Sequence, residues 1–173
     1  MPRITQHTEA LITERKRIVN ADIFISEAAV SDMISHADKG ASENAEVMGL
    51  LAGHVHRDDK GIYAIAERTV TSRLLSDAVS VRFDHSDMRA LFDALDGLNF
   101  DYVIVGWYHS HLGIGCFMSE TDVATHESSF GDDTGFAVVI DPIREELKVF
   151  KNSKDGLKEA SVIIMDDDQT QMA

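Results

Sequence analysis

The sequence predicts a mixed α/β fold (α+β), in which one largely antiparallel sheet is flanked by about three helices. Short runs rich in valine, isoleucine and aromatic residues outnumber the segments with helical apolar spacing, so strands are expected to outnumber helices. Several of these runs are joined by turns that contain glycine, asparagine or aspartate, and such hairpin connections pair neighbouring strands antiparallel. The 173 residues are 44% hydrophobic, and one domain with its own core is the simplest organisation.

Strand patterns recur along most of the chain. A charged turn at residues 57–61 predicts a hairpin, and a second turn is expected at residues 152–156. The run at residues 101–106 is apolar and β-branched, which is typical of a buried strand. The expected strands are residues 21–25, 46–56, 62–70, 79–83, 101–106, 136–140, 147–150 and 160–165.

Helices are predicted where a capping side chain precedes an apolar stripe. In the first helix the stripe includes Met33 and Ile34, which are expected to face the sheet, and Gly40 is expected to end the helix. The expected helices begin at Ser26, at Asp84 or Ser86, and at Ser119, and reach about residues 38, 98 and 129.

The two ends of the sequence are polar. Residues 1–20 carry mixed charges, and the pattern at residues 9–19 supports at most a loosely docked helix. Residues 167–173 are expected to be a frayed tail. Residues 21–166 are therefore the predicted domain.

The charge and hydropathy of the chain limit the classes of partner that it is expected to bind. The net charge is −14, from 30 acidic and 16 basic residues, which argues against broad nucleic-acid binding because such binding needs a positive surface. The excess acid suits a basic partner segment, or serves solubility alone. No apolar run reaches the ~18 residues of a membrane span, and no signal peptide is evident at the start. We therefore expect no membrane partner and a cytoplasmic location.

The segment with the strongest functional signal is residues 107–122. His109 and His111 are two residues apart at the end of a predicted strand, so both imidazoles point to one face and can converge on one ion. After a glycine-rich turn, Ser119 is placed as a helix N-cap, and Asp122 lies in the first helical turn, from which it can approach the histidines. Two imidazoles and a carboxylate, with a fourth position left for water, are a typical catalytic zinc site.

Each part of this pattern is weak evidence alone, since a His-x-His pair is common and Ser-x-x-Asp is most often only a helix cap. The order of strand, paired histidines, tight turn, cap and acid within one short segment is what indicates a metal site. Cys116, the single cysteine, excludes an intrachain disulfide. Its thiol either joins the metal site or packs in the turn as a small hydrophobe.

The arrangement His109-Ser-His111 with Ser119-x-x-Asp122 resembles the signature of the JAMM (MPN+) zinc metallopeptidases. Residues 106–108 and 113–116 resemble the branch that contains the proteasome-lid deubiquitinase and the signalosome deneddylase, and residues 46–51 and 138–142 also resemble family segments. The resemblance implies an MPN-type fold, with a curved mixed sheet and helices packed around it. Leu112 departs from the pattern, because the family usually has proline there, and the stiffness of the turn is affected.

The resemblance also implies roles for the site residues. One Zn²⁺ per chain would be held by His109, His111 and Asp122, and Glu46 would be the general base. Ser119 has two compatible roles, as the helix cap or as a hydrogen-bond donor to the oxyanion, and the resemblance favours the second. The implied function is a zinc-dependent isopeptidase that removes ubiquitin or a ubiquitin-like modifier from lysine by attack of a zinc-bound water.

Alternatives remain at the level of the sequence. Without the resemblance Glu46 is only an acid at a strand end, and Glu43, Glu67 and Asp84 could compete for the role of base. The function could instead be that of a non-catalytic MPN scaffold subunit, or of a JAMM peptidase that processes sulfur-carrier proteins. In either case the chain could act within a larger complex or as a homo-oligomer.

Three further histidines, His54, His56 and His126, lie outside this pattern. The second pair, His54 and His56, is interpreted as strand-end residues, since no acid follows at capping distance. His126 either supports the metal site from behind or is exposed on its helix, and exposure is the expectation. The loops expected to shape a substrate groove are residues 72–80 and the region after Phe150.

Overall fold

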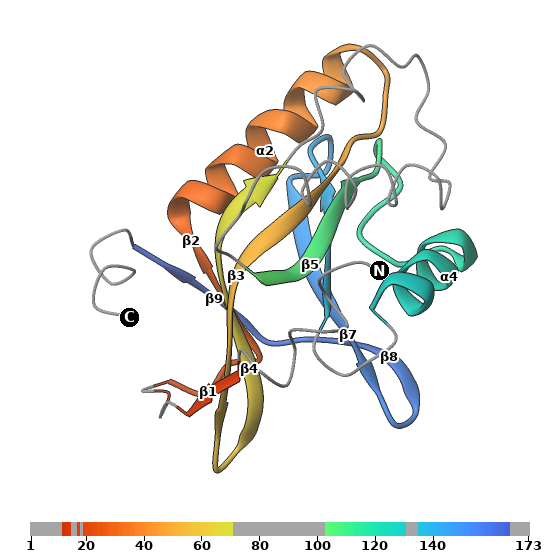
Figure 1. Ribbon diagram of the computed structural model, residues 1–173. Helices are drawn as coiled ribbons and strands as arrows, with labels where there is room; N and C mark the ends of the chain where they lie inside the picture. The colour runs from red at the N-terminus through yellow and green to blue at the C-terminus, as the bar shows by residue number, and fades with distance from the viewer. Residues whose placement is uncertain (1–11, 15–16, 18, 71–102, 131–134, 167–173) are drawn as a thin grey trace.

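One mixed sheet runs through the part of the chain that this computed structural model describes, which comprises residues 12–14, 17, 19–70, 103–130 and 135–166 (Figure 1). Its strands follow the order β8-β7-β6-β5-β3-β4-β2-β9, and β1 pairs with β3. The elements are β1 (Ile12–Glu14), β2 (Ile23–Ser26), α2 (Glu27–Ser42), β3 (Met48–Asp58), β4 (Gly61–Val70), β5 (Val103–Ser110), α4 (Glu120–Ser129), β6 (Phe136–Asp141), β7 (Glu146–Ser153), β8 (Gly156–Glu159) and β9 (Val162–Met165).

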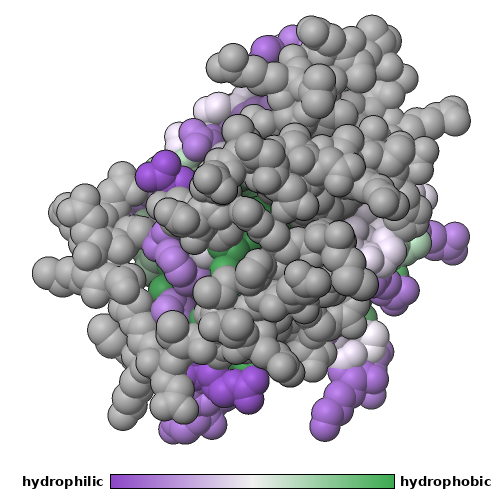
Figure 2. Space-filling view, viewed as in Figure 1, coloured by the Kyte–Doolittle hydropathy of each residue, from purple (hydrophilic) through white to green (hydrophobic). Residues whose placement is uncertain are grey.

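The predicted fold class is confirmed. Antiparallel ladders join β3 to both β4 and β5, and β7 to both β6 and β8. Parallel ladders join β1 to β3, β2 to β4 and to β9, and β5 to β6, so the sheet is mixed. The longest ladder is the antiparallel β3–β4 hairpin. Figure 2 shows hydrophilic residues at the tips of the β3–β4 and β7–β8 hairpins, at the lower edge of the face that it presents.

Helix α2 lies across one face of the curved sheet (Figure 1). Ser26 is its N-cap, as predicted: the Ser26 hydroxyl accepts from the Ala29 amide at 3.1 Å and donates to the Glu67 carbonyl at 2.9 Å. The cap therefore also ties the start of the helix to β4. Met33 is fully buried against the sheet, whereas Ile34, expected on the same face, is 43% exposed.

Gly40 does not end α2, contrary to the prediction, because the helix continues to Ser42. A Cβ atom at Gly40 would lie 2.5 Å from Val47 Cγ1 and 2.7 Å from the Ala45 carbonyl oxygen. The glycine is therefore needed for close packing of the returning chain, and the left-handed backbone conformation falls on Asn44, whose φ is 54°. The local pattern identified a glycine with a special role but assigned it the wrong one.

Two short strands were missed. Residues 12–14 form β1 within the segment predicted as at most a helix, because parallel pairing with β3 stabilises an extended backbone there. The turn expected at residues 152–156 is shorter in the structure, where it occupies residues 154–155. The chain then continues as β8, an exposed edge strand without an apolar alternation. The last strand begins at Val162. The strand and helix predicted between residues 79 and 98, and the loop before them, lie outside the described residues.

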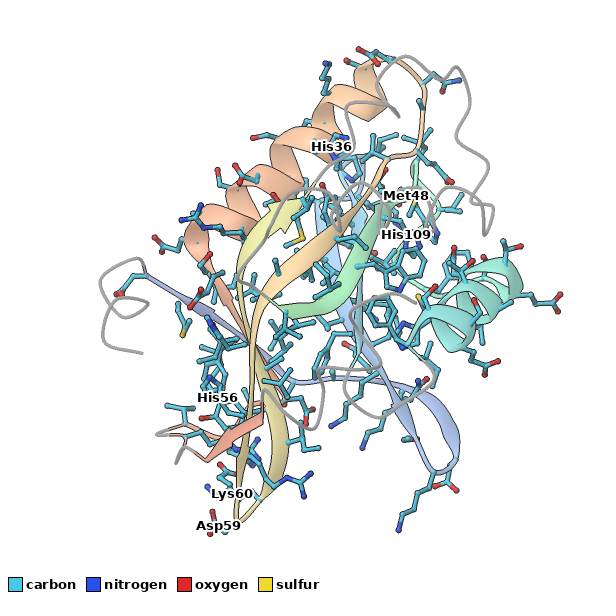
Figure 3. All side chains as sticks on the ribbon, viewed as in Figure 1. His36, Met48, His56, Asp59, Lys60 and His109 are labelled. Carbon is cyan, nitrogen blue, oxygen red and sulfur yellow. The ribbon has the colours of Figure 1, made fainter. Side chains whose placement is uncertain are left out.

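Two clusters of buried side chains cover the faces of β5. Tyr108 belongs to the cluster beneath α2, and its hydroxyl forms a 2.8 Å hydrogen bond with His36 Nδ1 on that helix (Figure 3). Trp107 belongs to the opposite cluster, together with Met48 and Phe130. Strand β5 is buried along its whole length, so its side chains are held firmly on both faces. In the described ranges, no helix has both the length and the hydropathy to cross a lipid bilayer.

Candidate functional site

The end of β5 places His109 and His111. His109 is 0% and His111 4% exposed, and their ring centroids are 5.1 Å apart. The His111 amide donates to the Ile140 carbonyl at 2.8 Å, which continues the pairing of β5 with β6 one residue beyond the strand. His109 lies opposite Met48 in the β3–β5 ladder and between β5 and α4 (Figure 3). The extended backbone therefore directs both imidazoles to one side.

The N-terminus of α4 places Asp122. Ser119 and Asp122 form a capping box: the Ser119 hydroxyl accepts from the Asp122 amide at 3.2 Å, and Asp122 Oδ2 accepts from the Ser119 amide at 2.9 Å. This bond folds the carboxylate back over the start of the helix. Asp122 Oδ2 consequently lies 3.2 Å from His109 Nε2 and 3.5 Å from His111 Nε2.

The three groups form a buried donor set that is suited to a cation. One ligand atom from each of His109, His111 and Asp122 lies within 4.8 Å of the other two. Burial by itself would raise the pKa of Asp122, but hydrogen bonds with His109 and His111 hold that pKa far below its usual value. Burial likewise opposes protonation of His111, whereas Asp122 and the Gly115 carbonyl raise its pKa overall. The carboxylate is thus an anion that draws positive charge into the site.

His111 is held in one tautomer by its neighbour in the glycine turn. Its Nδ1 lies 2.7 Å from the Gly115 carbonyl, which can only accept, so Nδ1 carries the proton. In the neutral ring the lone pair is then on Nε2, which faces the Asp122 carboxylate. Two electron-rich atoms at this separation repel each other unless a proton or a metal ion lies with them. The donor set therefore fits a metal ion such as zinc.

Glu46 reaches the site through a strand contact that the sequence did not predict. Ser110, between the two histidines, receives a hydrogen bond from the Val47 amide on its hydroxyl at 2.8 Å, and its own amide donates to the Val47 carbonyl at 2.9 Å. This pair places residue 46 beside the histidines. Partial burial raises the pKa of Glu46 above its ordinary value, and the charges of His111 and His109 act in the opposite direction. The Glu46 carboxyl group therefore lies close enough to His109, His111 and Asp122 to interact with their charges.

The competing acids are placed differently. Glu43 is exposed at the C-cap of α2, and Glu67 lies 3.5 Å from His54 on the β3–β4 hairpin. Asp84 lies outside the described residues. Of the acids considered from the sequence, the structure brings Glu46 and Asp122 to the histidines.

His126 is buried, which overturns the expectation of an exposed helical residue. It is 0% exposed, accepts a hydrogen bond from Trp107 Nε1 at 3.0 Å, and stacks on Phe130. The indole of Trp107 in turn stacks on the His109 ring, with centroids 4.7 Å apart and an interplanar angle of 23°. Trp107 therefore connects a donor-set histidine to the helix that carries Asp122. Only the helix periodicity, which puts His126 one turn after Asp122, hinted at this link.

Cys116 packs in the turn. Its thiol donates to the Val139 carbonyl at 3.2 Å, the residue is 8% exposed, and burial raises the pKa of the thiol. A raised pKa keeps the thiol neutral, and only the thiolate binds metals, so Cys116 is not suited to be a ligand. It packs instead as a small hydrophobe. The second histidine pair, His54 and His56, is not part of the set formed by His109, His111 and Asp122. His54 contacts Glu67, and His56 stacks on Tyr63.

Comparison with known proteins shows the family to which the chain belongs. A family model described as JAB1/Mov34/MPN/PAD-1 ubiquitin protease matches residues 19–131. COP9 signalosome complex subunit 5 of Debaryomyces hansenii is 32% identical over 127 residues, which cover 71% of this chain and 26% of that protein. The ubiquitin carboxyl-terminal hydrolase RPN11 of Saccharomyces cerevisiae is 35% identical over 125 residues, which cover 70% of this chain and 39% of that protein.

The chain thus matches well under half the length of these relatives. The fold is similar to the solution structure of protein DSY2949 from Desulfitobacterium hafniense, with a TM-score of 0.61 and 24% identity over 84% of this chain and 94% of that one. The match to the family model spans most of the described site, from the segment before β2 to the end of α4. The chain belongs to the JAB1/Mov34/MPN/PAD-1 ubiquitin protease family.

Proposed function

We propose that this chain is a zinc-dependent isopeptidase that removes ubiquitin or a ubiquitin-like modifier from a lysine side chain. The observation that carries the proposal is the buried set of His109, His111 and Asp122, with the half-buried Glu46 near enough to feel their charges. Family membership supports the reaction class, and relatives named as a ubiquitin hydrolase and a signalosome subunit support the substrate class.

One zinc ion per chain would be held by His109, His111 and a carboxylate oxygen of Asp122. The chemistry of these donors fits, because two neutral imidazoles and one carboxylate leave a position open for water. A zinc ion bound there would supply Lewis acidity and lower the pKa of that water toward neutrality.

Glu46 is the proposed general base and acid. It takes the proton of the attacking water and delivers it to the leaving lysine amine. Its raised pKa suits both tasks, because a carboxyl group whose pKa is closer to the working pH can both accept and return a proton. The Ser119 hydroxyl accepts from the Asp122 amide, and its own proton is directed to the oxyanion of the scissile carbonyl in this proposal.

A non-catalytic scaffold does not need a buried set of metal-binding groups. The set of His109, His111 and Asp122 beside a half-buried glutamate therefore favours the isopeptidase over the scaffold. A peptidase for sulfur-carrier proteins would use the same residues, so substrate has to separate it from the isopeptidase. The relatives named as subunits of the proteasome and the signalosome also favour work within a larger complex.

The test is a cleavage panel. Ubiquitin and ubiquitin-like proteins, each as a linear fusion and as a lysine conjugate, are incubated with the purified protein with and without a chelator, and zinc is measured by elemental analysis. We expect about one zinc per chain and chelator-sensitive release from a lysine conjugate. Release from a sulfur-carrier fusion alone would favour the peptidase, and a folded protein that binds no zinc would refute both.

A further inference from the structure

Asp141, the last residue of β6, is fully buried at 0% exposure, yet it contributes nothing to the donor set described above. Its carboxylate accepts four backbone N–H groups. Oδ1 accepts from Gly113 at 3.0 Å and from Ile143 and Arg144 at 3.1 Å each, and Oδ2 accepts from Gly115 at 2.6 Å. A buried carboxylate with this many donors holds specific segments together.

The four bonds fall into two kinds. Those from Ile143 and Arg144 are local and form the turn between β6 and β7, as Asp commonly does. Those from Gly113 and Gly115 come from residues 28 and 26 positions earlier, in the turn after His111. Both glycines have positive φ, 82° and 91°, a conformation in which nearby amides can converge on an anion.

Gly115 connects Asp141 to the histidine. The Gly115 amide donates to Asp141 Oδ2, and the Gly115 carbonyl accepts from His111 Nδ1 at 2.7 Å. A histidine that binds a metal through one nitrogen usually donates its other N–H to such an acceptor, and this contact sets the tautomer and the ring orientation. In this chain the acceptor is on a glycine turn, which has little stiffness of its own.

We propose that Asp141 is a positioning residue for the zinc centre, which through Gly115 holds His111 with its proton on Nδ1 and its Nε2 directed to the ion. The inference rests on the proposed function, because it assigns a role toward the same centre. Asp141 acts as an anion here, since a carboxylate that has lost its proton can accept from all four amides at once. Burial opposes this charge, but the backbone donors outweigh it and hold the pKa of Asp141 below its usual value.

The variant Asp141→Asn removes the one bond that leads to His111. An Asn carbonyl in the place of Oδ1 can still accept from Gly113, Ile143 and Arg144, so the local turn is kept. The amide NH₂ group then faces the Gly115 N–H, donor against donor, and the Gly115 bond is lost. Asp22→Asn is the matched control, because Asp22 also accepts a hydrogen bond from a backbone N–H, that of Ser161 at 2.9 Å, and pairs with Lys151 on β7.

Two measurements decide the proposal. In metal-free ¹⁵N-labelled protein, at a pH where the imidazoles are neutral, the Asp122 carboxylate opposes the Nδ1–H form of His111 and the Gly115 carbonyl favours it. The ring nitrogen shifts of His111 should therefore show a larger Nδ1–H fraction in the wild type than in Asp141→Asn. In chelator competition, zinc affinity should fall about 10–100-fold in Asp141→Asn, the usual loss when the partner of a metal-binding histidine is disturbed. Asp22→Asn should match the wild type in both.

An unchanged Nδ1–H fraction and wild-type zinc affinity in a folded Asp141→Asn protein would overturn the proposal. If circular dichroism shows that this variant is unfolded, Gly115→Ala decides instead: its Cβ is strained at φ 91° and meets Arg144 Nη1 at 3.1 Å, so the turn shifts while Asp141 is kept. The same two losses there support the proposal, and their absence refutes it. A wild type that binds no zinc would refute the proposed function, and the tautomer measurement would still test Asp141.

Discussion

At the scale of single residues, each group of the site depends on a neighbour that does no chemistry. The His109 ring stacks on Trp107, which donates to His126 one helical turn after Asp122. His111 donates to Gly115, and Ser110 brings the chain before β3 to the histidines. The precision that the proposed catalysis needs is therefore distributed over residues whose removal would change the geometry without removing a proposed ligand.

The substitution Glu46→Gln tests the base. It keeps the size and hydrogen-bonding reach of the side chain but cannot take a proton, so kcat should fall about 10²–10⁴-fold. Because Glu46 is not a ligand in the proposed centre, zinc content and the melting temperature should match the wild type. The measurements are steady-state cleavage of a ubiquitin-like conjugate and elemental analysis.

Glu43→Gln is the control for that experiment, since Glu43 is an exposed acid three residues earlier. It should cleave at the wild-type rate. Near wild-type cleavage by zinc-loaded Glu46→Gln would show that the base is another group, and Glu67 would be tested next.

Leu112→Pro tests the residue at which the turn departs from the family pattern that the sequence resembles. Leu112 is half-buried and follows His111, whose extended backbone suits the residue before a proline. Among the described residues, none accepts a hydrogen bond from the Leu112 amide. We expect unchanged zinc content and a gain of about 0.4–1 kcal/mol in the free energy of unfolding, because proline restricts the unfolded chain. Chemical denaturation measures this, and a marked loss of stability would show that Leu112 packs in the core.

At the scale of elements, two helices begin with the same device and use it differently. The Ser26 hydroxyl caps α2 and joins it to β4, far from any proposed chemistry. The Ser119 hydroxyl caps α4, and its partner in the capping box is the carboxylate of the donor set. One local structure thus serves only the fold in the first case, and both the fold and the site in the second.

This difference predicts the outcome of Ser26→Ala and Ser119→Ala. Each should lose about 1 kcal/mol in the free energy of unfolding, the usual cost of losing a helix N-cap. Only Ser119→Ala should also lose about 10²–10³-fold in kcat, as expected when an oxyanion donor is removed. Denaturation and cleavage assays on the two variants, with zinc content matched, make the comparison. Equal kcat in both would limit Ser119 to a capping role.

The β3–β4 hairpin carries a second element-scale contact, between Arg17 and Asp58. Arg17 Nε lies 2.6 Å from Asp58 Oδ2, and the guanidinium also sits over the Tyr63 ring. The hydrogen bond with Arg17 holds the pKa of Asp58 well below its ordinary value. The ionised form is therefore favoured in the folded state, and the stability it contributes is present above the unfolded pKa and is lost as pH falls through the folded pKa.

Asp58→Asn tests this linkage. At neutral pH the variant should melt below the wild type, and the difference should shrink as the pH is lowered below about 4, where Asp is protonated in the unfolded chain. Melting curves from pH 7 downward provide the measurement. A difference that stays constant with pH would show that packing, and not the charge of Asp58, is responsible.

At the scale of the whole molecule, the donor set joins parts of the chain that are distant in sequence. Its ligands come from the end of β5 and the start of α4, and Glu46 comes from the segment before β3. An ion held by such groups binds the folded state and not the unfolded chain, so zinc binding should add to the stability of the entire domain.

Chelation is therefore predicted to lower the melting temperature. At a free zinc concentration of about 100 times Kd, the stabilisation is about 2.7 kcal/mol. For a domain of this size that corresponds to roughly 5–11 °C. Scanning calorimetry with and without chelator checks this, and His109→Ala should show no difference between the two conditions. A wild type that is equally insensitive would contradict a zinc site built into the fold.

The sequence by itself determined the features that follow local rules. A period of two places His109 and His111 on one side of a strand, and a capping box joins residues three apart, so both halves of the donor set could be predicted. The cap at Ser26, the hairpin around Lys60 and the mixed fold class were predictable for the same reason. The assignment of Glu46 needed the resemblance to a family, because one acid at a strand end has no distinctive spacing.

Only the tertiary structure decided the contacts between distant segments. Parallel pairing of β5 with β6 brings Asp141 beside the glycine turn, and the Val47–Ser110 pair brings Glu46 to the histidines. The burial of His126 depends on which face of α4 meets Trp107. Such contacts depend on which strands pair and which faces are covered, and pairing and burial between distant segments leave no periodic trace in the local sequence.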